Sequence, residues 1–377
     1  MTDQSQNNKS VAPPRLVAWE ITRRCNLHCS HCRASSENAA YEGELTTEEI
    51  LSVVDGICQV GSPILILSGG EPLARQDIFT IADYAASKGL RVAVGTNGTL
   101  LTPEIAARLK KVPVARVSVS IDFPYPELQD RFRGAHGAFQ TAMKGIEYLR
   151  EAGVEIQINS TITRQNASYI AALLDLALNA GAVAFHPFML VPTGRGKNLG
   201  NDELPAEEYE RILSWINDKQ IELGEKIFFK PTDAPHYWRI IHQKKGNMQN
   251  VSGSYHGSQQ MPSRQQQHHG INAMTRGCLA GSGFCFISHT GRVQGCGYLD
   301  VEAGNVKKDS FKDIWTRSPL FMELRDLSLL KGKCGICEFK KLCGGCRARA
   351  YEMTGDYLGP EPYCIYEPAK MKEHTAL

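Results

Sequence analysis

Runs rich in β-branched and apolar residues alternate with amphipathic helical segments between residues 15 and 190. Alternation of this kind is typical of repeated β-α units that build a parallel sheet. Two helix starts support it, because Thr46 and Glu49 form a capping box and Thr102 followed by Pro103 opens another helix. We predict strands at residues 15–22, 64–70, 90–96, 115–122, 155–163 and 183–190. These six units predict an α/β fold arranged as an open or partial (β/α)6 barrel.

The rest of the chain divides by composition. A helix at about 205–223 closes the barrel, which we place at residues 15–225, after a short disordered tail at 1–14. Residues 226–277 include a polar stretch rich in Gln and Gly, and we predict a linker and mobile loop there. Residues 278–377 are dense in Cys and Gly, with too few hydrophobic residues to hold a fold without metal. We therefore expect a small second module that depends on metal.

Charge and hydropathy narrow the class of partner. The chain has 42 Lys and Arg against 40 Asp and Glu, which gives no electrostatic case for binding nucleic acid or an anionic membrane. The sequence contains no apolar run of about eighteen residues, and its polar first segment lacks the apolar core of a signal peptide. We predict a cytoplasmic globular protein that acts on a small molecule.

Three cysteines follow the first predicted strand in the spacing Cys25-x3-Cys29-x2-Cys32. They fall on a loop at the carboxyl end of the strand, where β-α folds build their sites. Twelve cysteines in a reducing compartment, gathered mainly in two clusters, indicate metal ligands rather than disulfides. Three thiolates on a four-iron cluster leave one iron open to a non-protein ligand. A zinc site would instead need a fourth ligand, from His28 or His31.

Together with the segment SGGEP at residues 68–72, the cysteine triplet resembles the radical S-adenosylmethionine (radical SAM) superfamily. The resemblance covers roughly residues 15–192. It implies a 4Fe-4S cluster whose open iron binds the amino and carboxylate groups of SAM, with reductive cleavage of SAM to a 5'-deoxyadenosyl radical. It also implies a low-potential electron donor such as ferredoxin or flavodoxin.

The same resemblance indicates which residues contact SAM. Six residues at strand ends match the family positions: Gly69, Gly70, Glu71, Asn97, Ser120 and Asp122. The two glycines let backbone approach a ligand closely, and the glutamate offers a carboxylate to an ammonium group. The segment at 188–192 resembles the one that lies along the adenine. The alternative for SGGEP is an ordinary tight turn. For Asn97, Ser120 and Asp122 the alternative is a helix cap or turn former, and for the segment at 188–192 it is core packing.

Eight further cysteines lie between residues 278 and 364. Their spacing resembles the SPASM extension, which binds auxiliary 4Fe-4S clusters. The resemblance assigns one cluster to Cys334, Cys337, Cys343 and Cys364, and another to Cys278, Cys285, Cys296 and Cys346. Two residues separate Cys343 from Cys346 here, whereas the family usually has three. The number of auxiliary clusters, one or two, therefore stays open. A pair of structural zinc knuckles is the alternative.

The residues around the cysteines narrow the range of candidate substrates. Segments 19–34, 277–299 and 343–358 are similar to those of the radical enzymes in the siroheme-dependent heme and heme d1 routes. Arg33 stands where enzymes of that group that strip other side chains tend to have Tyr. The resemblance implies an iron-porphyrin substrate and oxidative decarboxylation of two propionates of iron-coproporphyrin III to vinyl groups, giving heme b. The alternatives are a related enzyme that removes tetrapyrrole side chains and a peptide- or protein-modifying SPASM enzyme. Because about fourteen residues precede the first predicted strand, we expect no leader-binding domain there.

A porphyrin with four propionates requires cations and a broad apolar slot. The candidate cations follow the fourth and sixth predicted strands: Arg131, Arg133, His136, Arg195 and Lys197. Solvated surface charges are the alternative reading of each. His268 and His269 offer an axial ligand to the iron, against the alternative of a solvated loop. We further hypothesise that an auxiliary cluster accepts the electron that remains after each decarboxylation.

Overall fold

One ten-stranded sheet organises the part of the chain that the structure describes. The computed structural model describes residues 11–251 and 277–371. The strands lie in the order β10-β9-β8-β1-β2-β3-β4-β5-β6-β7. Their bounds are β1 Leu16–Thr22, β2 Ile64–Gly69, β3 Arg91–Thr96, β4 Arg116–Ser120, β5 Ile156–Ile162, β6 Ala184–Met189, β7 Phe228–Phe229, β8 Phe284–Ile287, β9 Arg292–Cys296 and β10 Leu299–Asn305.

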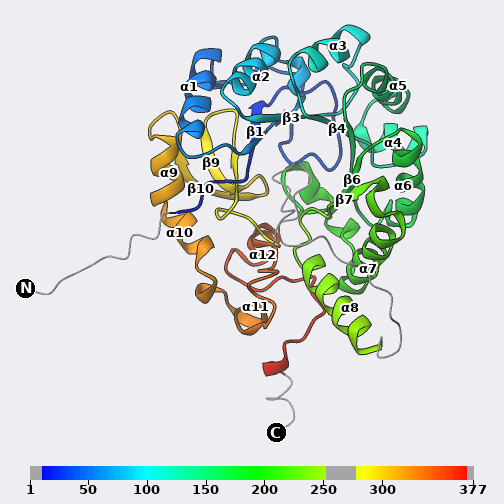
Figure 1. Ribbon diagram of the computed structural model, residues 1–377, viewed down its shortest axis with the longest axis vertical. Helices are drawn as coiled ribbons and strands as arrows, with labels where there is room; N and C mark the ends of the chain where they lie inside the picture. The colour runs from blue at the N-terminus through cyan, green and yellow to red at the C-terminus, as the bar shows by residue number, and fades with distance from the viewer. Residues whose placement is uncertain (1–10, 252–276, 372–377) are drawn as a thin grey trace, which may run out of the picture.

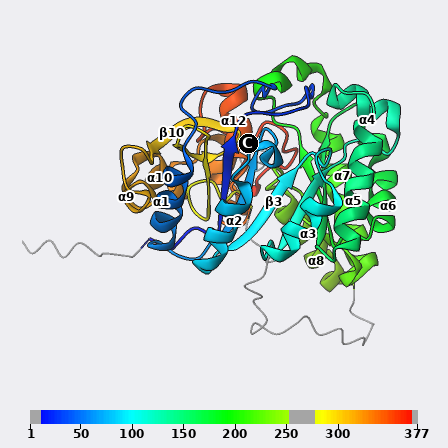
Figure 2. The ribbon, with the colours of Figure 1, turned by 90° about the horizontal axis from the view of Figure 1, so that it is seen from above.

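The first six strands are parallel, and helices connect them across the outside of the sheet (Figures 1 and 2). Thr46 and Glu49 form the predicted capping box at the start of the first helix. The six predicted strands and the radical SAM type of partial barrel are confirmed. The helices of this part are α1 Thr47–Cys58, α2 Ile78–Ser87, α3 Pro103–Lys111, α4 Pro126–Arg133, α5 Ala138–Glu151, α6 Ile170–Asn179 and α7 Ala206–Leu223.

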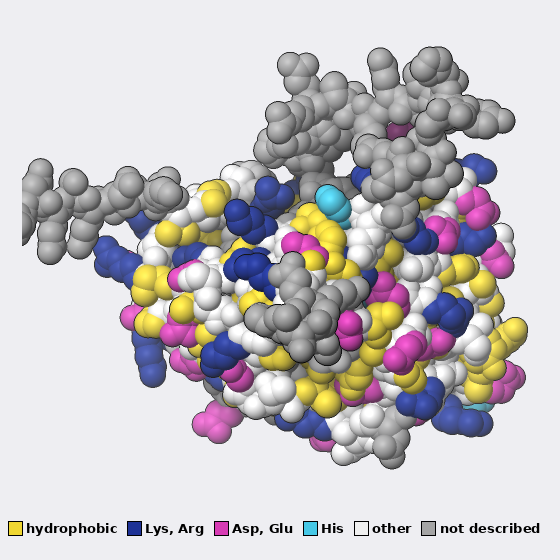
Figure 3. All heavy atoms as spheres, turned by 90° about the horizontal axis from the view of Figure 1, so that it is seen from below, with side chains coloured by type: hydrophobic (Ala, Val, Ile, Leu, Met, Phe, Trp, Pro, Cys, Tyr) yellow, Lys and Arg dark blue, Asp and Glu magenta, His cyan; other side chains and the backbone are white. Residues whose placement is uncertain are grey.

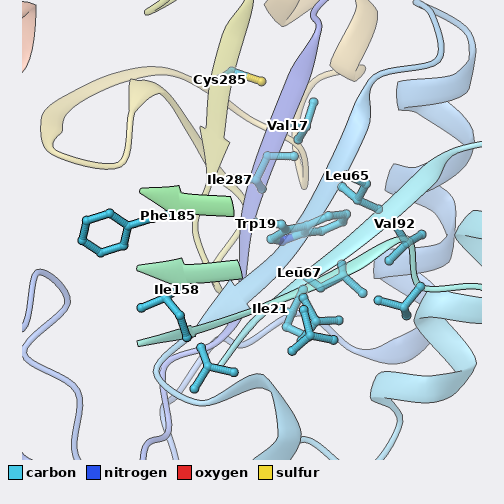
Figure 4. Packing of buried hydrophobic residues seen from close by; sticks show 14 of the residues in the cluster. Val17, Trp19, Ile21, Leu65, Leu67, Val92, Ile158, Phe185, Cys285 and Ile287 are labelled. Carbon is cyan, nitrogen blue, oxygen red and sulfur yellow. The ribbon is translucent and has the colours of Figure 1, made fainter. Parts of the chain in front are cut away.

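Side chains alternate between the two faces of the sheet, so each strand serves both a core and a cavity. Val17, Trp19 and Ile21 of β1 are fully buried in the hydrophobic core that the sheet forms with the helices (Figure 4). Leu16 and Ala18, from the same strand, line a cavity inside the barrel. The outer face therefore stabilises the fold, and the inner face is left to form a site.

The C-terminal module is continuous with the barrel sheet. Strand β8 pairs in parallel with β1, and β9 and β10 continue from it as antiparallel neighbours. We predicted a second module but not this junction. Because β8 pairs with β1, the barrel and the cysteine-rich region share one sheet. Four helices follow these strands: α9 Phe311–Arg317, α10 Pro319–Arg325, α11 Gly332–Ile336 and α12 Arg347–Thr354.

The range 226–277 is more ordered than we predicted. It contains β7, which pairs with β6, and a helix, α8 Tyr237–Val251. Tyr237 and Ile240 of this helix are buried in the main core, so a linker is the wrong description of residues 228–251. Residues 252–276, with His268 and His269, lie outside the described residues.

The predicted disordered tail, residues 1–14, needs a similar correction at its end. The Ala12 carbonyl accepts a hydrogen bond of 2.9 Å from the Trp315 indole, and Pro14 is buried. Ala12 and Pro14 therefore contact the folded part of the chain, whereas residues 1–10 lie outside the described range.

Charged side chains of both signs are interspersed on the face shown in Figure 3, in line with the nearly balanced sequence charge. In the described ranges, no helix combines the length and the apolar character needed to cross a lipid bilayer.

Candidate active site

The cysteine triplet lies on an irregular loop directly after β1. Cys25 and Cys29 are buried, and Cys32 is half-buried. The backbone N–H groups of Leu27 and Ser36 donate to the Sγ atoms of Cys25 and Cys32, each at 3.4 Å. Donors of this kind stabilise thiolate ligands of iron-sulfur clusters, so the loop fits such a cluster. Burial raises the pKa of the Cys25 thiol to about 11, which means that cluster binding must displace protons here.

Two residues from distant segments fix the shape of this loop. Arg195 donates from Nε to the Cys29 carbonyl and from Nη1 to the Ser36 carbonyl, both at 2.9 Å. Gly134 ends α4 with a φ of 68°, and a Cβ there would lie only 2.4 Å from the His28 carbonyl oxygen. The structure gives Arg195 a role in shaping the loop, and its Nη2 has no hydrogen-bond partner among the described residues. A contact between Arg195 and a substrate carboxylate stays a prediction.

Arg133 links the cysteine loop to the end of β4. Its Nη1 lies 3.8 Å from Cys29 Sγ, and its Nη2 lies 2.5 Å from Asp122 Oδ2. The side chains of Arg133 and Asp122 are 8% and 0% exposed, so the pair is shielded from water. The prediction that Arg133 binds a substrate carboxylate is therefore wrong, because Asp122 already neutralises it. A contact between Asp122 and SAM stays a prediction.

The two histidines of the loop have different surroundings. His31 stacks on Phe132 with ring centroids 4.4 Å apart, and burial lowers the pKa of His31 to about 4. His28 is exposed. Within the described residues, no three His, Cys, Asp or Glu side chains are arranged to hold a single metal ion, which is the arrangement that the zinc alternative needs.

Asn97 and Glu71 connect the strand ends to the loop. Asn97 donates from Nδ2 to Cys25 Sγ at 3.8 Å and to Asn26 Oδ1 at 2.9 Å. The Glu71 carboxylate accepts from the Asn97 N–H at 2.8 Å, the Thr96 hydroxyl at 2.7 Å and the Leu73 N–H at 3.0 Å. Burial nevertheless raises the pKa of Glu71 to about 6. Glu71 thus joins the ends of β2 and β3, and its contact with SAM stays a prediction.

Gly69 and Gly70 are required by the protein backbone itself. A Cβ on Gly69 would lie 2.2 Å from the Thr22 carbonyl oxygen, and a Cβ on Gly70 would lie 2.4 Å from those of Arg23 and Arg24. Gly69 also has a φ of 153°. The two glycines therefore let the start of the cysteine loop pass directly against the end of β2. We predicted close approach at this point but expected a ligand to make it.

The remaining predicted SAM contacts lie at the ends of β4 and β6. Ser120 is half-buried and, by the alternation along β4, faces the same side as Ser118, which lines the cavity. Within 188–192, the carbonyls of Met189 and Leu190 accept hydrogen bonds from Arg349 Nη2 at 3.2 and 3.1 Å. The C-terminal module thereby holds this segment in place. Contact of either element with SAM stays a prediction.

A buried charge cluster, which sequence reasoning missed, ties the cysteine loop to the C-terminal module. Glu20 of β1 pairs with Arg33 and with His289 Nδ1, the latter at 2.6 Å. Burial alone would raise the pKa of Glu20, but Arg33 and His289 outweigh it and lower the pKa to about 2. The Arg33 guanidinium also stacks over Phe286 at 4.5 Å. Arg33 follows Cys32 directly, and this position next to a predicted ligand was the sequence signal that pointed to a role for Arg33.

Four C-terminal cysteines line one small hollow: Cys334, Cys337, Cys343 and Cys364. The N–H groups of Glu361 and Gly345 donate to the Sγ atoms of Cys334 and Cys343, at 3.3 and 3.4 Å. Burial raises the pKa of Cys343 and Cys364. The structure thus brings together the four residues that the resemblance to the SPASM extension assigned to one cluster, with N–H donors that fit thiolate ligands.

Three other cysteines form a second group. Cys278, Cys296 and Cys346 line the large cavity inside the barrel. Burial raises the pKa of Cys296 and Cys346, and the neighbouring thiols add to both shifts. Cys346, whose spacing departs from the family pattern, therefore stands with the residues expected to share its site.

Cys285 does not belong to this group. It lies opposite Val17 in the β8-β1 pairing and is fully buried in the outer core beside Ile287 (Figure 4). Its neighbours Phe284 and Phe286 line the cavity instead. Because side chains alternate along a strand, Cys285 points away from the other thiols. The prediction that Cys285 is a cluster ligand is wrong.

The cavity of about 380 Å³ connects the two ends of the site. It reaches from Arg33 and Gly69, beside the cysteine loop, to the three thiols of the second group. Burial raises the pKa of Tyr298, and the charges of both Cys32 and Cys296 contribute to that shift. Tyr298 therefore lies within electrostatic reach of both cysteine groups, on the wall of the cavity between them.

Known proteins resemble this chain in sequence and fold. The sequence matches the Radical SAM superfamily over residues 19–177 and the SPASM iron-sulfur cluster-binding domain over residues 278–347. A protein from Methanosarcina barkeri named AdoMet-dependent heme synthase is 51% identical over 357 residues, which cover 95% of this chain and 98% of the relative. This chain belongs to the radical SAM superfamily.

A second relative supports this membership. A protein of the same name from Nitratidesulfovibrio vulgaris is 46% identical, over 95% of this radical SAM protein and 94% of the relative. The crystal structure of Streptococcus suis SuiB bound to S-adenosylmethionine shares the fold, with a TM-score of 0.72 and 16% identity over 94% of this chain and 78% of SuiB. The radical SAM protein is accordingly an enzyme that uses 4Fe-4S clusters and SAM.

Proposed function

We propose that this radical SAM enzyme acts in heme biosynthesis and converts two propionates of iron-coproporphyrin III to vinyl groups, giving heme b. Each conversion removes a hydrogen atom from the β-carbon, releases carbon dioxide and leaves one electron to be accepted. When bound, the N-terminal cluster and SAM would supply the 5'-deoxyadenosyl radical that takes the hydrogen. The observation that carries the proposal is the 51% identity to an AdoMet-dependent heme synthase over nearly the full length of both chains.

The cavity suits a small molecule with a large apolar part. Its volume of about 380 Å³ falls in the range typical of small-molecule sites. Aromatic side chains contribute much of the wall, among them Phe188, Phe228, Trp238 and Phe284. Such walls favour burial of a conjugated ring system. One end lies beside the cysteine loop, which supports a reacting propionate placed within reach of the radical.

Lys230 supports a carboxylate-bearing substrate. Its side chain lines the cavity, and burial lowers the pKa of its ammonium group. Among the described residues, no Asp or Glu forms an ion pair with Lys230, whereas Arg116 on the same wall pairs with Glu155 at 2.9 Å. A buried charge without a partner is costly, and an incoming propionate would supply the missing anion. Lys230 was not among the cations that we predicted.

The three-thiol group supports a route for the remaining electron. Cys278, Cys296 and Cys346 line the same cavity as Lys230, so a cluster held there would border the substrate. Iron-sulfur clusters are tuned over a wide range of potential by burial and by hydrogen bonds to sulfur. The cluster at this site is therefore our proposed first acceptor, with onward transfer to an external acceptor.

The test is turnover of the proposed substrate. The full-length protein is reconstituted with iron and sulfide without oxygen and then given dithionite, SAM and iron-coproporphyrin III. Mass spectrometry should show loss of carbon dioxide and two hydrogens from each of two propionates, and chromatography should show 5'-deoxyadenosine. The Cys29→Ala variant serves as control and should give neither product. Formation of 5'-deoxyadenosine in the wild type with intact porphyrin would overturn the proposed substrate and favour the peptide-modifying alternative.

A further inference from the structure

The second cysteine group has one thiol fewer than a closed four-thiolate site. Cys278, Cys296 and Cys346 line the cavity, and Cys285 faces the outer core opposite Val17. A four-iron cluster has four iron atoms to ligate, so one iron at this site needs a ligand other than cysteine.

Asp233 lies on the same cavity wall, directly after the β7 segment. Its backbone is held firmly, because the Thr232 N–H donates to the Pro187 carbonyl at 2.8 Å and Arg349 Nη1 donates to the Asp233 carbonyl at 2.8 Å. Asp233 has a φ of 59°, a left-handed conformation that is uncommon for residues other than glycine. Strained residues of this kind persist where the surrounding structure enforces them, and they cluster at functional sites.

The Asp233 side chain is half-buried, and one oxygen of its carboxylate is shielded from water. Its Oδ2 has no hydrogen-bond partner among the described residues. The Arg349 guanidinium lies near this carboxylate, but its ion pair is with Glu361, 3.4 Å away, and its hydrogen bond to Asp233 goes to the backbone carbonyl. Asp233 lines the same cavity as Cys296 and Cys346, and its charge lies within electrostatic reach of both thiols. An unpaired buried carboxylate is unfavourable unless a cation or a metal meets it.

We propose that Asp233 is the fourth protein ligand of the cluster held by Cys278, Cys296 and Cys346. Its carboxylate oxygen would replace the thiolate that Cys285 does not supply. An oxygen ligand is harder than a thiolate and makes one iron of this cluster chemically distinct from the other three. The inference rests on the auxiliary cluster and not on the proposed substrate, so it can be tested without porphyrin.

The experiment follows the spectrum and potential of this cluster in the full-length chain. Cys25, Cys29 and Cys32 are replaced by alanine in every sample, which removes the signal of the N-terminal cluster. Asp233→Asn keeps the size and the tolerance for left-handed φ but removes the anionic ligand, and Asp233→Cys offers a thiolate instead. Cys346→Ala identifies the signal of the three-thiol site, and Cys285→Ala is the matched control for loss of a buried thiol.

Electron paramagnetic resonance of the reduced protein and iron analysis give the outcome. We expect Asp233→Asn to change the g-values and midpoint potential of the signal that Cys346→Ala abolishes, or to remove it with about four iron ions. Asp233→Cys should retain that iron with a more negative potential, and Cys285→Ala should match the parent. An unchanged signal and potential in Asp233→Asn would overturn the proposal, as would loss of the cluster in both Asp233 variants.

Discussion

Arg133 Nη1 lies 3.8 Å from Cys29 Sγ while Arg133 Nη2 lies 2.5 Å from Asp122 Oδ2, so one buried guanidinium serves both the cysteine loop and the end of β4. A positive donor beside a thiolate ligand stabilises the more negative, reduced state of a cluster. Polar residues from other segments thus contact the ligands of the cluster: Arg133 at the end of α4 contacts Cys29, and Asn97 after β3 contacts Cys25.

Replacing Arg133 by methionine should destabilise the protein by about 3–5 kcal/mol, because Asp122 is left buried and unpaired. The midpoint potential of the N-terminal cluster should also become more negative. Urea unfolding without oxygen and redox titration measure the two effects. Arg131→Met, an exposed position on the same helix, is the control and should change stability by less than about 0.5 kcal/mol. Equal behaviour of the two variants would contradict the role given to Arg133.

Gly70→Ala should prevent the cysteine loop from reaching its position. The added Cβ would lie 2.4 Å from the carbonyl oxygens of Arg23 and Arg24, and neither backbone can move without shifting the loop. We expect destabilisation of about 1–3 kcal/mol or more and a loss of about four iron ions per chain. Gly200→Ala is the control, since nothing lies within 4 Å of its added Cβ. Normal iron content in Gly70→Ala would show that the backbone contact is not required.

Stability should depend on pH through Glu20. Its pKa falls from the usual 4.5 to about 2 in the folded protein, so the unfolded chain binds the proton first as the pH is lowered. The stabilisation, about 3 kcal/mol from the size of the shift, is fully present above pH 4.5 and is lost between pH 4.5 and 2. The stability difference between wild type and Glu20→Gln should therefore narrow over this window in denaturant titrations. A difference that stays constant there would refute the assignment.

Lys230→Met should weaken binding of iron-coproporphyrin III by about 10- to 100-fold, the value of one charge-assisted hydrogen bond of about 1.5–3 kcal/mol. Lys230→Arg should retain most of the affinity, because it keeps the positive charge. Absorbance titration of the porphyrin measures binding, and SAM cleavage without substrate should be unchanged. Lys226→Met, at an exposed lysine, is the control. Unaltered affinity in Lys230→Met would remove this residue from the site.

Local sequence patterns predicted those parts of the site whose residues lie close together in the chain. The spacing of Cys25, Cys29 and Cys32 after a strand was sufficient to predict the cysteine loop, because strand and loop are adjacent in sequence. The resemblance to the SPASM extension assigned Cys334 and Cys337 to one group with Cys343 and Cys364, and the structure places all four on one hollow.

Other features depend on pairing between distant segments, which local patterns do not encode. The face on which Cys285 lies is set by the register of β8 against β1, where Cys285 meets Val17 across more than two hundred residues. Arg133 was a candidate ligand of a substrate carboxylate, and only the folded chain shows it between Cys29 and Asp122. We did not predict Lys230, because only the folded chain places it on the cavity wall.

Hydrogen abstraction from a propionate is the central claim, and isotope transfer tests it most directly. Iron-coproporphyrin III deuterated at the propionate β-carbons is supplied to the reconstituted enzyme with SAM and dithionite, and the 5'-deoxyadenosine formed is analysed by mass spectrometry. The account predicts one deuterium in each 5'-deoxyadenosine, formed together with vinyl products. Unlabelled 5'-deoxyadenosine, with the porphyrin intact or converted, would contradict it.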